Sequence, residues 1–212
     1  MENQNSHSNL IEYIKNADHN QPAPTQAQWA DFTNNWLSID FRRTYCTNFS
    51  WAIITAELID ELVKICQGKR VVDIGCGSGF LLGKLKERGI DIVGYDSRST
   101  HNFEFYHPDV EFKDYRDIEL KNFDLVIISW PSYDHTEINQ VIENMHDGQL
   151  LVHCGESHGG CTGDDDFNDC LESQFVEVPN NLAAVEHSWM SIHDHWNLLK
   201  KTHQEGKKLC HL

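Results

Sequence analysis

The stretch VVDIGCGSGF, residues 71–80, decides the fold of this chain of 212 residues. Two valines and an isoleucine around Asp73 have the apolar character of a strand that is buried on both faces of a parallel sheet. Glycines then follow at Gly75, Gly77 and Gly79. Because glycine has no Cβ, its backbone adopts positive φ easily and lets a ligand approach closely. The stretch therefore predicts a buried strand that ends in a glycine-rich, ligand-binding turn.

Segments typical of strands alternate with segments typical of helices on both sides of this turn. Apolar residues at helical spacing predict an amphipathic helix over residues 52–67. Further helices are expected at residues 79–89, 134–148 and 164–175. Strands are expected at residues 70–75, 91–96, 110–115, 123–130, 149–156 and 175–179, with a returning edge strand within 191–201. This alternation predicts an α/β fold with a doubly wound, mostly parallel sheet and helices on both faces.

The residues ahead of this alternating pattern have a different composition. Residues 1–28 are polar and broken by two prolines, which predicts a flexible N-terminal segment. Residues 29–51 are rich in aromatic side chains and are expected to form a helical or irregular cover at the start of the domain, residues 29–212. We expect these aromatic residues to form a satellite core, with a lid over the substrate as the alternative: Trp29, Phe32, Trp36 and Phe41.

The charge of the chain limits its partners. The formal net charge is -16, with 33 acidic residues against 17 basic ones. No Lys or Arg lies between Asn122 and Leu199. Nucleic-acid binding depends on Lys and Arg that neutralise phosphates, so this acidic chain is not expected to bind nucleic acid. The expected partner is a small molecule, neutral or cationic, and the sequence does not indicate an oligomeric state.

The cysteines and the hydropathy pattern predict the location. Seven cysteines are scattered without a CxxC pair, which is typical of reduced thiols in a cytoplasmic protein. The N-terminus has no basic region followed by an apolar run, so no secretory signal is expected. No apolar stretch approaches the ~20 residues of a membrane span. A zinc site is the weaker interpretation of Cys154, His158, Cys161 and Cys170, whose irregular spacing matches no structural zinc site, and no metal is expected.

The residues around the glycine turn predict the kind of ligand. A dinucleotide-binding GxGxxG motif needs glycine at position 80, where Phe80 stands, and no GK[ST] follows for a phosphate-binding loop. A carboxylate at the head of the turn is unsuited to a pyrophosphate but suits a ligand with an ammonium and a sulfonium group. The second strand ends in Asp96, where a carboxylate can accept ribose hydroxyl protons. The third ends near Asp114 and Tyr115, which suit an adenine.

Together these stretches resemble the class I S-adenosyl-L-methionine (SAM) dependent methyltransferases. The resemblance lies in VVDIGCGSG, VGYD, EFKDYRD and FDLVIISW, and it covers about residues 52–155 in order and spacing. It implies a Rossmann-like sheet of the seven-stranded methyltransferase type and SAM as cofactor. Asp73 and the turn would lie near the methionine part, Asp96 would bind the ribose, and Asp114 would flank the adenine. The cofactor-binding residues implied are Asp73, Gly75, Cys76, Gly77, Gly79, Asp96, Ser97, Asp114, Tyr115 and Trp130.

The stretch SWPSYDH, residues 129–135, follows the fourth strand and is the first candidate for acceptor binding. It is similar to the Asn/Asp/Ser-Pro-Pro-Tyr/Phe loop of amine-methylating enzymes. Trp130 occupies the polar position of that loop and Ser132 replaces its second proline, which are two departures. The resemblance favours an amine acceptor and makes Tyr133 and Asp134 catalytic candidates. As an alternative, Asp134 caps the helix that follows.

A second candidate for catalysis is Glu156, in the glycine-rich stretch after the fifth strand. A carboxylate in a closed site can take a proton or pair with a cationic substrate. The alternative, equally open, is that Glu156 accepts hydrogen bonds from backbone amides of its own turn.

A closer resemblance extends over nearly the whole chain after residue 48. FSWAI, WPSYD, GESHGGCTGDD and SIHD are similar to landmarks of a group of small methyltransferase-like proteins, and they draw attention to Trp51 and Glu156. The resemblance supplies no reaction. The function predicted is a SAM-dependent methyltransferase that acts on a small neutral or cationic acceptor, with an amine favoured. The alternatives are a non-catalytic SAM- or S-adenosylhomocysteine-binding protein and an aminopropyl-type transferase that uses a related nucleoside cofactor.

Overall fold

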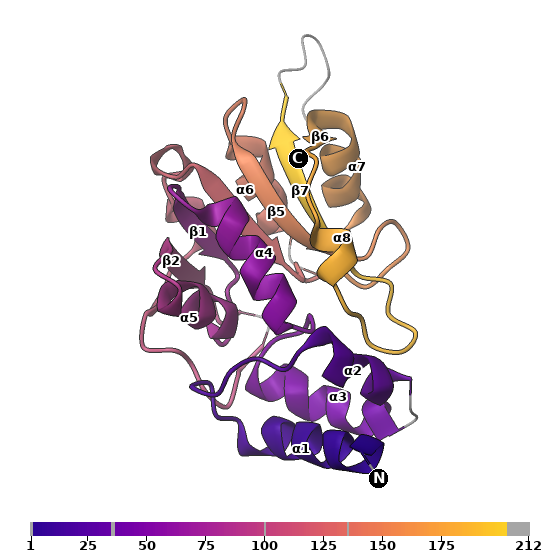
Figure 1. Cartoon of the computed structure of the whole chain (residues 1–212). Coiled ribbons are helices and arrows are strands. Elements are labelled where there is room, and N and C mark those ends of the chain that lie inside the picture. Colours follow the sequence, from indigo (N-terminus) through magenta and orange to yellow (C-terminus); the bar gives the residue numbers. More distant parts are fainter. Residues whose placement is uncertain (1, 35–36, 100, 135, 203–212) are drawn as a thin grey trace.

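The computed structural model describes residues 2–34, 37–99, 101–134 and 136–202 (Figure 1). In these residues seven strands form one sheet in the order β3-β2-β1-β4-β5-β7-β6. The strands are β1 (Arg70–Ile74), β2 (Asp91–Asp96), β3 (Val110–Phe112), β4 (Leu125–Ser129), β5 (Leu150–Gly155), β6 (Phe175–Glu177) and β7 (His195–Lys201). The predicted α/β sheet of seven-stranded type is confirmed.

The strand directions divide the sheet in two. The strands from β3 to β5 pair in parallel, and β7 runs antiparallel to both β5 and β6. The expectation of an edge strand within residues 191–201 is wrong, because β7 lies between two partners and β6 takes the edge. Trp196 and Leu198 of β7 are buried in the core. In an outermost strand these side chains would be partly exposed.

Helices cover both faces of the sheet, as a doubly wound fold requires. On one face α4 (Ala56–Cys66), α5 (Phe80–Glu87) and the short α8 (Leu182–Val185) share a hydrophobic cluster with β1, β4 and β5. On the other face α6 (Glu137–Asn144) and α7 (Asp165–Gln174) pack on the alternate residues of the same strands. Two 3-10 turns, Tyr115–Asp117 and Leu120–Asn122, connect β3 to β4. No helix in the part of the chain described here is long and apolar enough to span a membrane.

The N-terminal residues form three packed helices, α1 (Glu2–Asn16), α2 (Gln26–Thr33) and α3 (Leu37–Asn48), which Figure 1 shows gathered together beyond the start of α4. The prediction of a flexible segment over residues 1–28 is wrong for the residues that the structure describes. Leu10 and Ile14, one helical turn apart, are 1% and 0% exposed. The polar composition of α1 concealed this short apolar stripe, which Tyr13, 7% exposed, extends.

The aromatic residues of the cover belong to the core. Trp29 and Phe32 are buried and join the cluster that lies under α4 and α5, so they form no separate satellite and no lid. Trp29 also meets Trp189 edge to face, with ring centroids 5.5 Å apart. Phe41 packs against the same cluster, and Trp36 lies outside the described residues. The cover is therefore fixed on the sheet domain by continuous packing.

Candidate functional site

A cavity of about 370 Å³ lies at the carboxyl ends of β1 and β4, beneath the cover. This is the edge at which parallel α/β sheets bind their ligands. Seven of the residues predicted for the cofactor line it: Asp73, Gly75, Cys76, Gly77, Asp96, Tyr115 and Trp130. The remaining predicted residues, Gly79, Ser97, Asp114, Tyr133, Asp134 and Glu156, are not among its lining residues.

The glycine turn brings main chain, rather than side chains, to the cavity. Gly77 has φ +57°, and a Cβ there would lie 2.8 Å from the ring of Phe103, so only glycine fits. Gly79, with φ +75°, serves the fold instead: it precedes α5, and a Cβ there would collide with Val110 of β3. The turn therefore presents open backbone at Gly77 and closes the helix against the sheet at Gly79.

Asp73 is the most unusual group in the cavity wall. It is 2% exposed, and its Oδ1 atom has no hydrogen-bond partner in the structure. Burial, with a smaller contribution from the nearby Asp96, raises the pKa of its carboxyl group to about 7. A buried, unsatisfied carboxyl group costs stability unless a partner arrives. Its position at the cavity wall makes that partner a ligand with a donor or a positive charge.

Asp96 ends β2 and holds the glycine turn in place. Its two oxygens accept hydrogen bonds from the backbone nitrogens of Gly77, at 2.9 Å, and Arg98, at 2.7 Å. Burial raises the pKa of Asp96, although these two hydrogen bonds oppose the shift. A carboxylate has about four acceptor positions, so Asp96 can still accept two ligand hydroxyl groups.

Tyr115 and Ser97 lie on the same side of the cavity as Asp96. The hydroxyl group of Ser97 donates to that of Tyr115 at 3.4 Å, and burial raises the pKa of Tyr115 to about 12. Ser97 thus supports a lining residue. Asp114 is different: it is exposed, caps the 3-10 turn that begins at Tyr115, and pairs with Arg116 at 2.5 Å. Its side chain is engaged with Arg116 outside the cavity, which the sequence did not indicate.

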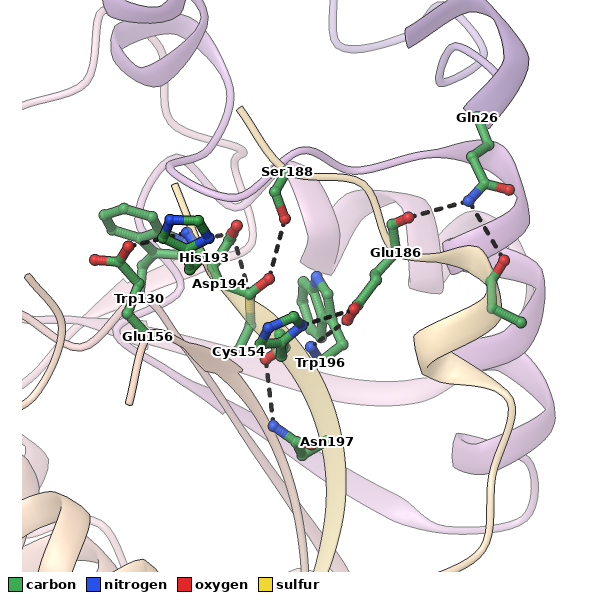
Figure 2. A network of polar contacts seen from close by, with 12 residues as sticks. Gln26, Trp130, Cys154, Glu156, Glu186, Ser188, His193, Asp194, Trp196 and Asn197 are labelled. Atoms are coloured by element: carbon green, nitrogen blue, oxygen red, sulfur yellow. Dashed lines mark hydrogen bonds and ion pairs between the residues drawn. The ribbon is translucent and has the colours of Figure 1, made fainter. Parts of the chain in front are cut away.

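Trp130 follows β4 and is held in an unusual conformation. Its φ is +57°, a region that bulky residues rarely adopt and that is found most often at functional sites. The indole nitrogen donates to Oδ2 of the buried Asp194 at 3.0 Å (Figure 2). The backbone nitrogen donates to the carbonyl of Cys154 at 2.8 Å. Asp194 lies in the SIHD stretch, which the sequence marked only as a landmark and not as a site residue.

Glu156 has the amide-capping arrangement rather than a free carboxylate. Its Oε2 accepts from the backbone nitrogen of Cys161 at 2.8 Å and from the Cys161 thiol at 2.9 Å. Its Oε1 accepts from the backbone nitrogen of His193 at 3.0 Å (Figure 2). Burial opposes ionisation, but these hydrogen bonds outweigh it and lower the pKa of Glu156. The carboxylate ties the loop after β5 to the segment that carries Asp194.

Tyr133 and Asp134 lie at the surface and are not among the lining residues of the cavity. Tyr133 is 51% exposed, and Asp134 is exposed as well. The alternative role of Asp134 as a helix cap is also wrong, because α6 begins at Glu137 and Thr136 occupies its N-cap position. An isolated bridge between Ser132 and Thr162 turns this loop toward the loop after β5, which leaves the next residues at the surface.

Several lining residues were missed by sequence reasoning. Arg42 and Phe49 come from the cover, and His101 and Phe103 come from the long connection between β2 and β3. Phe49 begins the FSWAI landmark, but the segments around Arg42, His101 and Phe103 have no motif or periodicity that marks a ligand site. Trp51 also lines the cavity, and the FSWAI landmark had drawn attention to it.

Within the described ranges, no three or more His, Cys, Asp or Glu side chains gather as they would around a metal ion.

Comparisons with known proteins fit this geometry. Residues 55–152, slightly less than half of the chain, match the family described as methionine biosynthesis protein MetW. A ubiquinone biosynthesis O-methyltransferase of Paracidovorax citrulli is 26% identical over 138 residues, which are 59% of this chain and 52% of that protein. The same enzyme of Bordetella avium is 45% identical over 40 residues, 19% of this chain and 17% of that one. The chain thus spans about half the length, or less, of these curated relatives.

Two solved structures give the likeness in three dimensions. Magnesium protoporphyrin IX methyltransferase from Synechocystis with bound SAH is 13% identical, covering 69% of this chain and 83% of that chain, with a TM-score of 0.48. A SAM-dependent methyltransferase from Mesorhizobium loti is 19% identical, covering 48% and 52%, with a TM-score of 0.35. The strand order is that of the seven-stranded methyltransferase sheet, and the family match and the curated relatives make the chain similar to the class I SAM-dependent methyltransferases.

The buried Asp73 carboxyl group has a measurable consequence for the ligand-free protein. In the unfolded chain an Asp carboxyl group has a pKa near 4, whereas in the folded protein the pKa of Asp73 is about 7. Asp73 therefore makes the free energy of unfolding fall as pH rises through this window. We expect the free energy of unfolding of Asp73→Asn, relative to that of the wild type, to increase by about 1–3 kcal/mol from pH 5 to pH 8. Urea unfolding at both pH values measures this, and an unchanged difference between the two proteins would contradict it.

Proposed function

We propose that this chain binds SAM in the cavity and transfers the SAM methyl group to a small acceptor molecule. The observation that carries the proposal is the pairing of two buried carboxyl groups at successive strand ends, Asp73 on β1 and Asp96 on β2, around an open glycine turn. One group lacks a hydrogen-bond partner, and the other has acceptor positions to spare. The family match and the curated relatives support the same cofactor.

Each part of SAM has a matching residue. The ammonium group of the methionine part would pair with Asp73 and satisfy its Oδ1 atom, which removes the cost of burying that carboxyl group. The ribose hydroxyls would donate to Asp96. Tyr115, on the cavity wall beside Asp96, would contact the adenine. Gly77 would let the cofactor approach the backbone closely.

SAM would supply the reactive group, a methyl carbon on a positively charged sulfur. The acceptor nucleophile forms a bond to this carbon as the carbon–sulfur bond breaks, and S-adenosylhomocysteine (SAH) is the leaving group. An amine acceptor then loses its extra proton to solvent, so the reaction needs no base on the protein. What the chain contributes is alignment of the acceptor and exclusion of water, and the cover over the cavity suits both tasks.

The acceptor is proposed to be a small molecule with an amine favoured. The loop of Ser129 and Trp130 supports this through its resemblance to amine-methylating enzymes, and both residues line the cavity. Glu156 enters the proposal as a positioning residue, because its carboxylate fixes the loop of Cys161, a lining residue. The absence of a nucleic-acid partner and a cytoplasmic location stay predictions.

The proposal is tested by calorimetric titration of SAM and SAH into the wild type and two matched variants. Asp96→Ala removes a carboxylate from the cavity wall, and we expect it to weaken both ligands tenfold or more, about 1.4 kcal/mol. Asp114→Ala removes an exposed carboxylate outside the cavity, and we expect less than a twofold change. Failure of the folded wild type to bind either ligand would overturn the proposal.

The same titration separates the rival functions. Preference for decarboxylated SAM over SAM would identify an aminopropyl-type transferase. Tight binding of SAM without SAH release, over a panel of amine, carboxylate and thiol acceptors, would identify a non-catalytic binding protein. We expect SAM to be preferred and SAH to be released with at least one amine of the panel.

Cofactor affinity is expected to depend on pH through Asp73. The cationic methionine part binds the ionised carboxylate, and the ionised fraction of a group with a pKa of about 7 rises about tenfold from pH 6 to pH 8. We therefore expect SAH to bind the wild type up to about tenfold more tightly at pH 8 than at pH 6. In Asp73→Asn, calorimetry should show weaker binding that no longer changes over this range. A wild-type affinity that stays flat would exclude Asp73 from this role.

A further inference from the structure

Arg42 adds a positive charge to a cavity for which the sequence predicted acidic lining residues, Asp73 and Asp96. It lies on α3 of the cover, and its side chain lines the cavity. Its guanidinium group stands over the indole ring of Trp130, 5.7 Å from the ring centre. The guanidinium thus lies on the loop after β4, which was predicted to hold the acceptor.

This arginine has no carboxylate partner among the described residues. The exposed Arg70, Arg88 and Arg116 pair with Asp124, Asp60 and Asp114 respectively. Arg42 forms no such ion pair: its side chain forms a hydrogen bond with the Cys46 thiol, and its Nε atom is buried without a hydrogen-bond partner. Arg43 and Arg98 form no ion pair among the described residues either, but of these three arginines only Arg42 lines the cavity. A partly buried charge gains from a paired anion, and the cavity is where that anion can bind.

Flat aromatic surfaces stand next to Arg42. The rings of Trp51 and Trp130 lie nearly parallel, at 19°, with centroids 5.8 Å apart, and both line the cavity. His101 meets Trp51 edge to face at 5.3 Å and continues this aromatic wall. Planar rings prefer stacked or edge-on contacts with such surfaces. The wall therefore suits a planar aromatic ligand better than a flexible aliphatic one.

The wall is also held in place before any ligand binds. The hydrogen bond from Trp130 to the buried Asp194 fixes the indole, and a hydrogen bond to Cys154 fixes the backbone at its positive φ. Preorganised side chains lose little entropy when a ligand binds. Strain that the surrounding structure maintains is typical of sites that recognise a ligand.

We propose that Arg42, Trp51 and Trp130 form the acceptor end of the cavity and select a planar aromatic acceptor that carries a carboxylate. The inference rests on the proposed function and names the substrate class for it. The neutral or cationic acceptor was predicted from residues 122–199, which lack Lys and Arg, and Arg42 of the cover adds the charge that this stretch lacks. An aromatic amine with a carboxylate satisfies both the amine-type loop and Arg42.

A carboxylate in this cavity has two possible sources, the acceptor and the methionine part of SAM. Asp73 on β1 and the glycine turn that follows this strand are the residues expected at the methionine part. Arg42 contacts Trp130, which follows β4. The geometry assigns the carboxylate to the acceptor, and the experiment separates the two sources.

The test uses the wild type, Arg42→Gln and the matched control Arg43→Gln, which removes the same charge from an exposed neighbour on α3. Each protein is saturated with SAH and titrated by calorimetry with 4-aminobenzoate and with 4-aminobenzamide, which lacks the carboxylate. We expect the wild type and Arg43→Gln to prefer the acid by tenfold or more, about 1.4 kcal/mol. Arg42→Gln should lose this preference and keep SAH affinity within twofold, and Arg42→Lys should restore part of it.

Three results would overturn the inference, each with SAH bound by the wild type so that the proposed function itself stands. One is equal binding of the acid and the amide by the wild type. Another is the absence of binding of either compound. The third is that Arg42→Gln weakens the binding of SAH but leaves the binding of 5′-methylthioadenosine, which has no carboxylate, unchanged. Arg42 would then bind the carboxylate of the cofactor. Failure of SAH to bind the wild type would instead remove the proposed function.

Discussion

Burial of the Asp73 carboxyl group at the carboxyl end of β1 is the interaction on which the site depends. β1 lies between β2 and β4 and is covered on both faces, so its last side chains cannot reach bulk water. Burial at this position raises the pKa of the Asp73 carboxyl group, and the buried group destabilises the ligand-free fold. The glycine turn leaves open the direction from which a cationic partner can approach, so the stability lost in the free protein is recovered on binding.

The cover shapes the other end of the cavity, and it is joined to the sheet domain by the segment of residues 186–194. Gln26 of α2 donates to the backbone oxygen of Glu186 at 3.0 Å, and the Glu186 carboxylate accepts from the backbone nitrogen of Trp196 at 2.7 Å (Figure 2). Thr33 and His187 are 2.6 Å apart. The same segment carries Asp194, which holds Trp130. The segment of residues 186–194 therefore connects α2 of the cover to the loop that carries Trp130.

Local pattern was enough to predict the alternating strands, the helices around them and seven residues that line the cavity. Asp73, Gly77 and Asp96 follow from their position at strand ends, because the ligand edge of a parallel sheet is known once the strands are known. The position of Arg42 at the cavity and the burial of α1 result from tertiary packing. Such packing produces no motif in the sequence from which either could be predicted. Asp114 does not line the cavity, and its carboxylate pairs with Arg116, two residues away.

The most direct test of the central claim is a crystal structure of the chain with SAH. We expect SAH to occupy the cavity between the cover and the ends of β1 and β4. Its ammonium group should lie within hydrogen-bond distance of Asp73 Oδ1, and its ribose hydroxyls should donate to Asp96. SAH bound elsewhere, or bound in the cavity with Asp73 still unpartnered, would contradict the account.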